Sequence, residues 1–211
     1  MPLSTQEYLP GVGEILFSES FDDSELWDTV ASPSANVILA DNQLTFSIAS
    51  DNPSTLLLSL RKEPLLGNFY LEMTAHLNLC RGNDRYGLVF RAGSSGSYYR
   101  YVLNCKGQTR YERVIGGQAS APRDWLTSPL APAGAPGEVR IGVWAVGSEM
   151  RFFLNDRYQY TIEDGTYLTG TIGLFVSSST TTPTSVSFSD MVVYAVSYKR
   201  PTPTRIPSTT P

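Results

Sequence analysis

Residues 85–114, with the sequence RYGLVFRAGSSGSYYRYVLNCKGQTRYERV, decide the fold class. The stretch holds three runs in which apolar or aromatic residues alternate with polar ones, and the short segments GSSG and KGQ separate the runs. Alternation with a period of two is typical of β-strands with one buried face, and short Gly-rich or Ser-rich segments are typical of turns. The stretch therefore predicts three successive antiparallel strands.

The same pattern continues on both sides of this stretch. It predicts further strands at residues 14–23, 42–50, 54–61, 68–80, 137–147, 149–162, 170–178 and 186–196. We expect a hairpin between residues 42–50 and 54–61, another at Gly147-Ser148, and a tight reversal at Asn155-Asp156. A total of about eleven to thirteen strands with no convincing helix predicts an all-β, two-sheet antiparallel sandwich.

The domain organisation follows from where the alternation begins and ends. Residues 1–13 are an irregular N-terminal extension, residues 14–197 are one β-sandwich domain, and residues 198–211, YKRPTPTRIPSTTP, are a Pro/Thr-rich linker or tail. Such tracts are typical of linkers and stalks in surface proteins. The first residues lack the basic and apolar regions of a signal peptide, which leaves a cytoplasmic protein or a segment of a larger one. We expect an exported domain, extracellular or at the cell surface, within a larger anchored protein.

Charge and cysteine content narrow the partners. The 211 residues carry a net charge of −4, which does not favour nucleic acid. No apolar run is long enough to span a membrane.

Cys80 and Cys105 allow one intramolecular disulfide. In a meander of strands they lie two strand spacings apart, so a bridge requires that the two turns lean together. The sequence therefore leaves two alternatives for Cys80 and Cys105, a disulfide or two free thiols.

Sorting alternate residues by face isolates a polar surface. We expect the strand at residues 68–80 and the three strands of residues 85–114 to be neighbours that share one non-core face. The candidate ligand-binding residues on it are Tyr70, Glu72, His76, Arg91, Tyr98, Arg100, Asn104, Arg110 and Glu112. This face is either a solvated surface with charges paired across strands or a groove. In a groove, planar donors and carboxylates would hydrogen-bond sugar hydroxyls while tyrosine rings stack on sugar faces.

The long segment at residues 119–136 interrupts the rhythm of strands, and Trp125 lies inside it. Loops of this length in a compact domain are often functional. Trp125 is therefore either a buried anchor for the loop or an aromatic platform beside a binding groove.

The order of strands resembles a known architecture. The stretch that opens this section, followed by EVRIGVWAVGSEMRFFLNDRYQYTIED, GTIGLFV and VSFSDMVVY, resembles the jelly roll of the concanavalin A-like lectin/glucanase superfamily. More narrowly, it resembles the laminin G-like and 3-keto-disaccharide-hydrolase-like domains of bacterial surface proteins. The resemblance covers about residues 15–194. It implies two bent sheets, often with carbohydrate on the concave one, in a fold shared by lectins, hydrolases and adhesion modules.

The resemblance also implies a structural calcium ion, because members of this superfamily commonly hold one. The first and last strands often pair in such folds, so their carboxylates could converge. The candidate ligands are Glu19, Asp22, Asp23 and Asp190. The alternative is that these residues are ordinary turn-capping carboxylates.

The sequence disfavours an enzyme. The glucanases of this superfamily carry a Glu-x-Asp-x-x-Glu signature, and Glu72 is followed by MTAHL instead. Glu72 and Glu112 would lie on the order of 14 Å apart if they are three strands apart on one face, which is too far for either hydrolytic mechanism. We therefore predict a non-catalytic extracellular module that binds carbohydrate through its polar and aromatic face. The alternatives are a carbohydrate-active enzyme, in which His76 could serve as base, and a structural or adhesive module that binds protein in a surface assembly.

Overall fold

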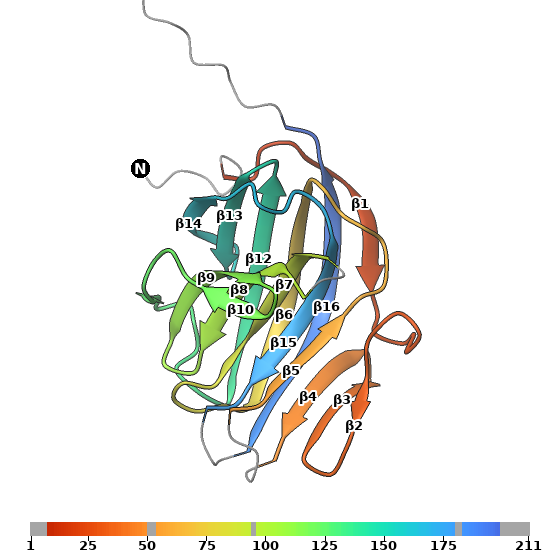
Figure 1. Ribbon diagram of the computed structural model, residues 1–211, viewed down its shortest axis with the longest axis vertical. Coiled ribbons are helices and arrows are strands. Elements are labelled where there is room, and N and C mark those ends of the chain that lie inside the picture. The colour runs from red at the N-terminus through yellow and green to blue at the C-terminus, as the bar shows by residue number, and fades with distance from the viewer. Residues whose placement is uncertain (1–7, 50–53, 94–95, 180–182, 199–211) are drawn as a thin grey trace, which may run out of the picture.

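The computed structural model describes residues 8–49, 54–93, 96–179 and 183–198 (Figure 1). The chain is almost entirely β-strand in these residues, because its alternating sequence suits pleated strands with one buried face. The strands are β1 (Val12–Glu19), β2 (Val30–Ala31), β3 (Ala35–Ala40), β4 (Gln43–Ile48), β5 (Leu56–Leu60), β6 (Phe69–Leu79), β7 (Arg85–Ala92), β8 (Tyr98–Asn104), β9 (Gln108–Ile115), β10 (Gln118–Ser120), β11 (Leu126–Thr127), β12 (Gly137–Val146), β13 (Glu149–Leu154), β14 (Arg157–Glu163), β15 (Thr171–Ser177) and β16 (Thr184–Val196).

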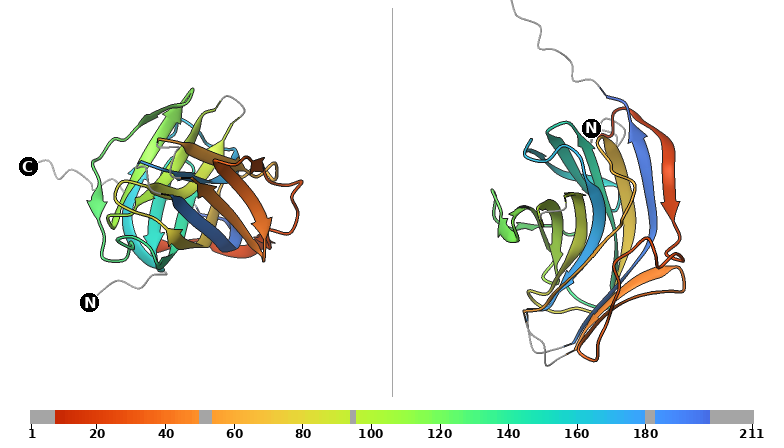
Figure 2. Two further views of the ribbon diagram at one scale, coloured as in Figure 1. Left: turned by 90° about the horizontal axis from the view of Figure 1, so that it is seen from below. Right: turned by 45° about the vertical axis from the view of Figure 1, so that its right-hand side comes forward.

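The strands form two antiparallel sheets packed face to face (Figure 2). The nine-stranded sheet has the order β14-β13-β12-β6-β16-β4-β3-β2, and β1 pairs with β16. The seven-stranded sheet has the order β10-β9-β8-β7-β15-β5, and β11 pairs with β9. This arrangement confirms the predicted two-sheet β-sandwich and the expected pairing of the first and last strands.

The core lies between the sheets and is built from the residues that the alternation assigned to it. Tyr86, Leu88 and Phe90 of β7 are fully buried there, as are Tyr99 and Tyr101 of β8. The two hairpins expected after residue 137 are also confirmed, since Val146 pairs with Glu149 and Leu154 with Arg157. In these segments the local alternation was sufficient to assign the strands and their core-facing residues.

The predicted hairpin between residues 42–50 and 54–61 is wrong. β4 pairs with β3 and β16 in the nine-stranded sheet, whereas β5 pairs with β15 in the other sheet. The sequence prediction also missed β3, which forms the actual hairpin with β4. A short connection can either close a hairpin or carry the chain from one layer to the other, and alternation alone does not distinguish the two.

The expectation that four successive strands lie side by side is likewise wrong. β6 lies in the nine-stranded sheet between β12 and β16, and β7, β8 and β9 lie in the seven-stranded sheet. The chain crosses between the layers at residues 80–84. Consequently Tyr70, Glu72 and His76 do not share a face with the arginines of β8 and β9.

The same crossing between the layers explains how Cys80 and Cys105 come to lie close together. Cys80 directly follows β6 and Cys105 directly follows β8, so the two residues come from different sheets. They are joined by a disulfide with a Cα–Cα distance of 5.8 Å. The bridge therefore ties the two layers together at one end of the sandwich. No helix in the described part of the chain has the length and apolarity needed to cross a membrane.

Candidate functional site

Val102 of β8 lies on the outer face of the seven-stranded sheet, among polar residues of β8 and β9. In the strand register, Val102 of β8 pairs with Arg110 of β9 on one side and with Gly87 of β7 on the other. Arg100 precedes Val102 on the same face and pairs with Glu112 of β9. Val102 is fully buried although it faces outward. It belongs to an apolar cluster on this face that includes Val89 and Phe175, with Trp125 packed against it.

Three guanidinium groups converge on the carboxylate of Glu112. Arg100 contacts Oε2, and the Nε of Arg110 donates to Oε1 at 2.7 Å, with a further contact from its Nη2. Arg85 lies farther away, with its Nη1 at 3.9 Å from Oε1. Glu112 is 1 % exposed, whereas the side chain of Arg110 is 23 % exposed and that of Arg85 39 %. The cluster thus has a buried anion at its base and accessible cations at its mouth.

Aromatic rings fix two of these guanidinium planes. The Arg110 guanidinium carbon lies 4.3 Å from the centre of the Trp125 ring, and that of Arg100 lies 5.0 Å from the Phe175 ring. Both distances are within the range of a cation–π interaction. Trp125 belongs to the segment between β10 and β11, so this loop folds back over the sheet and supplies an aromatic wall. Trp125 is half-buried and also packs against the apolar cluster of this face, so both the anchor and the platform remain predictions.

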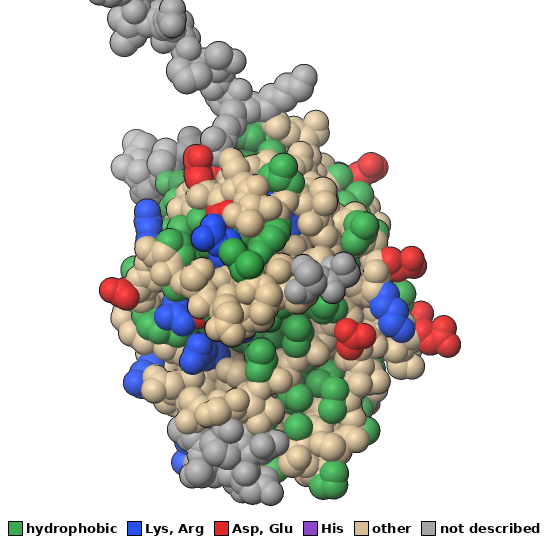
Figure 3. Space-filling view, viewed as in Figure 1, with side chains coloured by type: hydrophobic (Ala, Val, Ile, Leu, Met, Phe, Trp, Pro, Cys, Tyr) green, Lys and Arg blue, Asp and Glu red, His purple; other side chains and the backbone are tan. Residues whose placement is uncertain are grey.

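Two adjoining pockets open above the cluster, and we name them together the arginine trough. They measure about 350 Å³ and about 270 Å³ and share Arg85 and Ser179. The first is lined by Asn83, Arg85, Asn104, Arg110, Trp125 and Ser179, and the second by Ser54, Leu56, Arg85, Arg100, Ser177, Ser178 and Ser179. Figure 3 looks onto this face: Lys and Arg side chains gather where β8 and β9 lie, and hydrophobic ones lie over β15 and β5.

Next to the trough, the same outer face is apolar. Tyr98 is only 5 % exposed and packs with Val89, Val114 and Phe175, with Trp125 against the cluster. The ring of Tyr98 is therefore part of a packed patch rather than an open stacking surface. This differs from the role that the sequence suggested for it.

Arg91 faces the opposite way from the prediction. Its φ of 51° and a register shift between β7 and β15 mark a bulge at this point of the strand. The bulge directs the guanidinium inward, where it donates to the carbonyls of Gly147 at 2.7 Å, Tyr167 at 3.0 Å and Gly67 at 3.2 Å. Burial lowers the pKa of Arg91 from its ordinary value. Arg91 is 1 % exposed and is not a trough residue, so its assignment to the polar face was wrong.

Asn104 lies at the turn where β8 meets β9. Its side-chain oxygen accepts hydrogen bonds from the backbone N–H of Lys106 and of Gln108, and its amide donates to the Gln108 side chain at 2.9 Å. Asn104 therefore shapes the turn and lines the trough at the same time.

The remaining sequence candidates form a separate network on the outer face of the nine-stranded sheet. Glu72 accepts hydrogen bonds from Tyr70 at 2.9 Å and from Arg140 at 2.9 Å, while His76 contacts Glu138 at 3.1 Å. Burial, followed by the neighbouring Glu72 carboxylate, raises the pKa of Tyr70 above its ordinary value. Glu72 and the trough lie on opposite outer faces of the sandwich. The pairing of Glu72 with Glu112 considered from the sequence is therefore excluded by the layer arrangement.

The predicted calcium ligands are engaged elsewhere. Glu19 binds the Nε of Arg61 at 2.8 Å, Asp23 accepts the backbone N–H of Glu25, and Asp190 accepts the hydroxyl of Ser189. Asp22 is exposed. Over the described residues, no three His, Cys, Asp or Glu side chains form a group that could hold a metal ion. The calcium prediction finds no support in this arrangement.

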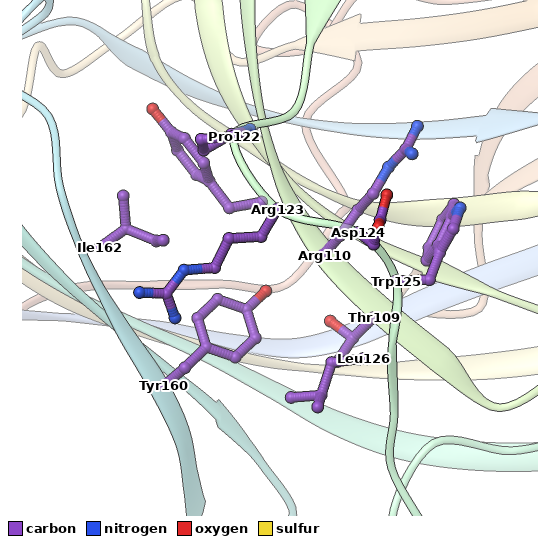
Figure 4. Close-up of a pocket in the computed structure, with 10 residues that line it drawn as sticks. Thr109, Arg110, Pro122, Arg123, Asp124, Trp125, Leu126, Tyr160 and Ile162 are labelled. Atoms are coloured by element: carbon purple, nitrogen blue, oxygen red, sulfur yellow. The ribbon is translucent and has the colours of Figure 1, made fainter.

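A smaller pocket of about 150 Å³ lies on the other side of Trp125, between β9 and β14 (Figure 4). These strands come from different sheets, so the pocket marks the open edge of the sandwich. Figure 4 shows Arg123 stretched across it towards Tyr160 and Ile162. The buried hydroxyls of Thr109 and Tyr160 have no hydrogen-bond partner among the described residues. We call this the edge pocket.

No protein-family model matches the chain, and no curated protein matches its sequence. Solved structures do match. The carbohydrate binding module CBM66 from Bacillus subtilis has a TM-score of 0.64 at 15% identity, over 81% of this chain and 96% of that one. A beta-1,3-1,4-glucanase (lichenase) from a mouse hindgut metagenome has a TM-score of 0.64 at 14% identity, over 84% and 97%. The beta-glucanase of Bacillus licheniformis has a TM-score of 0.60 at 11% identity, over 87% and 98%.

The chain has the concanavalin A-like, glucanase-type fold. Its identity to each of these structures is far too low to transfer a function, and the neighbours include both a binding module and hydrolases. The function of this concanavalin A-like sandwich has to be argued from its own side chains.

Arg85 and the serines at the end of β15 and directly after it, Ser177, Ser178 and Ser179, are trough residues that the sequence prediction left out. Arg85 occupies an outward position in the alternation of β7, so the pattern itself contained the signal. Ser177 could not be found in this way, because β15 is far from β7 in the sequence and pairs with it only in the folded sheet. The same holds for Ser178 and Ser179, which directly follow β15.

Proposed function

We propose that this chain is a non-catalytic carbohydrate-binding module that holds a glycan in the arginine trough. The observation that carries the proposal is the convergence of Arg85, Arg100 and Arg110 beside the Trp125 ring, at two adjoining pockets on one sheet face. Guanidinium groups donate several hydrogen bonds in one plane, which suits the hydroxyls of a sugar, and an aromatic ring suits the apolar face of a sugar.

The proposal of binding without catalysis rests on the carboxylates. Glycoside hydrolysis requires two carboxyl groups on either side of the scissile bond. None of the described residues that line the arginine trough is an Asp or a Glu. The nearby Glu112 is buried and bound by arginines, so its oxygens are held by cations rather than presented to a substrate.

We further propose that the module acts outside the cell or at its surface. The Cys80–Cys105 disulfide supports this, since disulfides persist in oxidising compartments and are rare in the cytosol. The partner in this proposal is a glycan that an exported module would meet there.

Retention on a panel of immobilised polysaccharides tests the proposal. We expect the protein to bind at least one glycan and to release no shortened products from it. Trp125→Ala should weaken this binding about tenfold through the loss of one stacking surface. Arg157→Gln is the matched control, because Arg157 is exposed on β14 of the other sheet; it should bind as the wild type does. Failure of the wild-type protein to bind any glycan would contradict the proposal.

A further inference from the structure

The charge of the chain is distributed unevenly around the arginine trough. Between Arg81 and Trp125 the sequence contains eight Lys and Arg residues and three Asp and Glu residues, a local net charge of +5. The whole chain has a net charge of −4, so all other residues together carry −9. The positive segment comprises β7 to β10 and their connections, and three of its arginines, Arg85, Arg100 and Arg110, line the trough.

Within the trough the cations also outnumber the available anions. Glu112 can neutralise one of the three guanidinium groups that surround it. Asp84, a second carboxylate at this end, is fully buried and accepts hydrogen bonds from the backbone N–H of Arg81, from Ser179 and from Thr184. No ion pair joins Arg85, Arg100 or Arg110 to Asp84, or to the exposed Asp124 beside Trp125, in the described structure, so these three guanidinium groups share the single carboxylate of Glu112.

The unbalanced guanidinium is that of Arg85. Its distance of 3.9 Å to Glu112 is too long for a hydrogen bond, and its side chain makes no other contact with an anion in the described structure. Arg85 is also the most exposed of the three arginines, and it lines both pockets of the trough. Its forked donors therefore line the open space of the trough, and its partners on the two neighbouring strands, Asn104 and Ser177, are uncharged.

We infer that the arginine trough selects glycans that carry carboxylate or sulfate groups, and that Arg85 binds this negative charge. The inference rests on the proposed function and names its ligand class. A guanidinium group forms short, paired hydrogen bonds with the oxygens of a carboxylate or sulfate, and these are stronger than its bonds to a neutral hydroxyl. A neutral glycan would fill the same trough but leave the charge of Arg85 without a counter-charge.

The test compares glycans that differ in charge alone. Polygalacturonate and its methyl ester form the carboxylate arm, and chondroitin sulfate and its desulfated form make the sulfate arm. We expect the charged member of at least one pair to bind about tenfold more tightly than its neutral partner. Raising the ionic strength from about 0.05 M to about 0.5 M should reduce this difference, since salt screens exposed charges.

Arg85→Gln should abolish the preference for the charged member while leaving the melting temperature unchanged, since Arg85 is only half-buried. Arg157→Gln should keep both the preference and the affinity. Equal binding of the charged and neutral members would overturn the inference and leave the proposed function standing. Equally tight binding of polyaspartate or of an oligonucleotide would overturn it as well, because the trough would then recognise charge without sugar. Binding of no glycan at all would reject the proposed function itself.

Discussion

At the scale of single residues, Arg91 and Glu112 show how this protein uses buried charge. The guanidinium of Arg91 is held by three backbone carbonyls from three connecting segments, and its partners among the described residues include no carboxylate. Glu112, by contrast, is the shared partner of several guanidinium groups on the sheet face. The first arrangement fixes loops to the end of the sandwich, and the second keeps cations in place at the trough.

We expect Arg91→Gln to lower the free energy of unfolding by about 3 kcal/mol, because buried carbonyls of Gly147, Tyr167 and Gly67 lose their donors. Urea denaturation measures this change. Arg157→Gln, an exposed substitution, should change it by less than about 0.5 kcal/mol. An Arg91→Gln protein as stable as the wild type would show that these bonds contribute little.

Glu112→Gln should destabilise the fold by about 2 kcal/mol, because the mostly buried Arg100 then loses its counter-charge. The double variant Arg100→Met/Glu112→Leu removes both charges and should be more stable than Glu112→Gln alone. The comparison is made by denaturant unfolding of all three proteins. If the double variant is the least stable, the ion pair is worth more than its burial costs.

Asp164 predicts an acid-dependent contribution to stability. Burial acts to raise the pKa of this carboxyl, but hydrogen bonds from Thr166, Tyr99 and Tyr111 outweigh it, so the pKa lies below its ordinary value of 3.8. A lowered folded-state pKa stabilises the fold above about pH 4 and loses that effect as the pH falls through the folded pKa. Asp164→Asn should thus be less stable than the wild type at neutral pH and lose less stability between about pH 4 and pH 2. Parallel curves for the two proteins would disprove the linkage.

At the scale of elements, the local sequence pattern predicted where the strands lie and which face of each strand is buried. The pairing of strands depends instead on segments that are far apart in the sequence. The alternation in residues 85–114 placed Tyr86, Leu88 and Tyr101 in the core correctly, because a buried face imposes period two on the sequence. The alternation could not show that β6 belongs to the other sheet, because a hairpin within one sheet and a connection between the two sheets can both consist of a short polar segment. The bulge at Arg91 was invisible for a similar reason: one extra residue reverses the facing of everything after it.

The disulfide gives a prediction at this scale. Cys80 and Cys105 join the two sheets across a sequence separation of 25 residues. The double variant Cys80→Ser/Cys105→Ser should lower the free energy of unfolding by about 3 kcal/mol, because the unfolded chain regains the entropy of that loop. Denaturant unfolding of this variant and of the oxidised wild type measures the difference, and the reduced wild type, which also lacks the disulfide, should unfold like the variant. A double variant that unfolds like the oxidised wild type would contradict the stapling role.

At the scale of the whole molecule, the two outer faces of the sandwich differ. The seven-stranded sheet carries the arginine trough, while the outer face of the nine-stranded sheet holds the network around Glu72. A sequence-based sorting of faces merged these two surfaces into one. Three of its candidates, Arg100, Arg110 and Glu112, do meet, because β8 and β9 are true neighbours both in sequence and in the sheet.

The most direct test of the central claim is a nuclear magnetic resonance titration of the three tryptophan indole N–H groups with a retained glycan. Trp27 and Trp144 are buried, whereas Trp125 lines the arginine trough. We predict that the glycan shifts the indole signal that is missing in Trp125→Ala and leaves the other two in place. A glycan that binds while this signal stays fixed, or that shifts the signal of Trp144 instead, would contradict the assignment of the trough as the binding site.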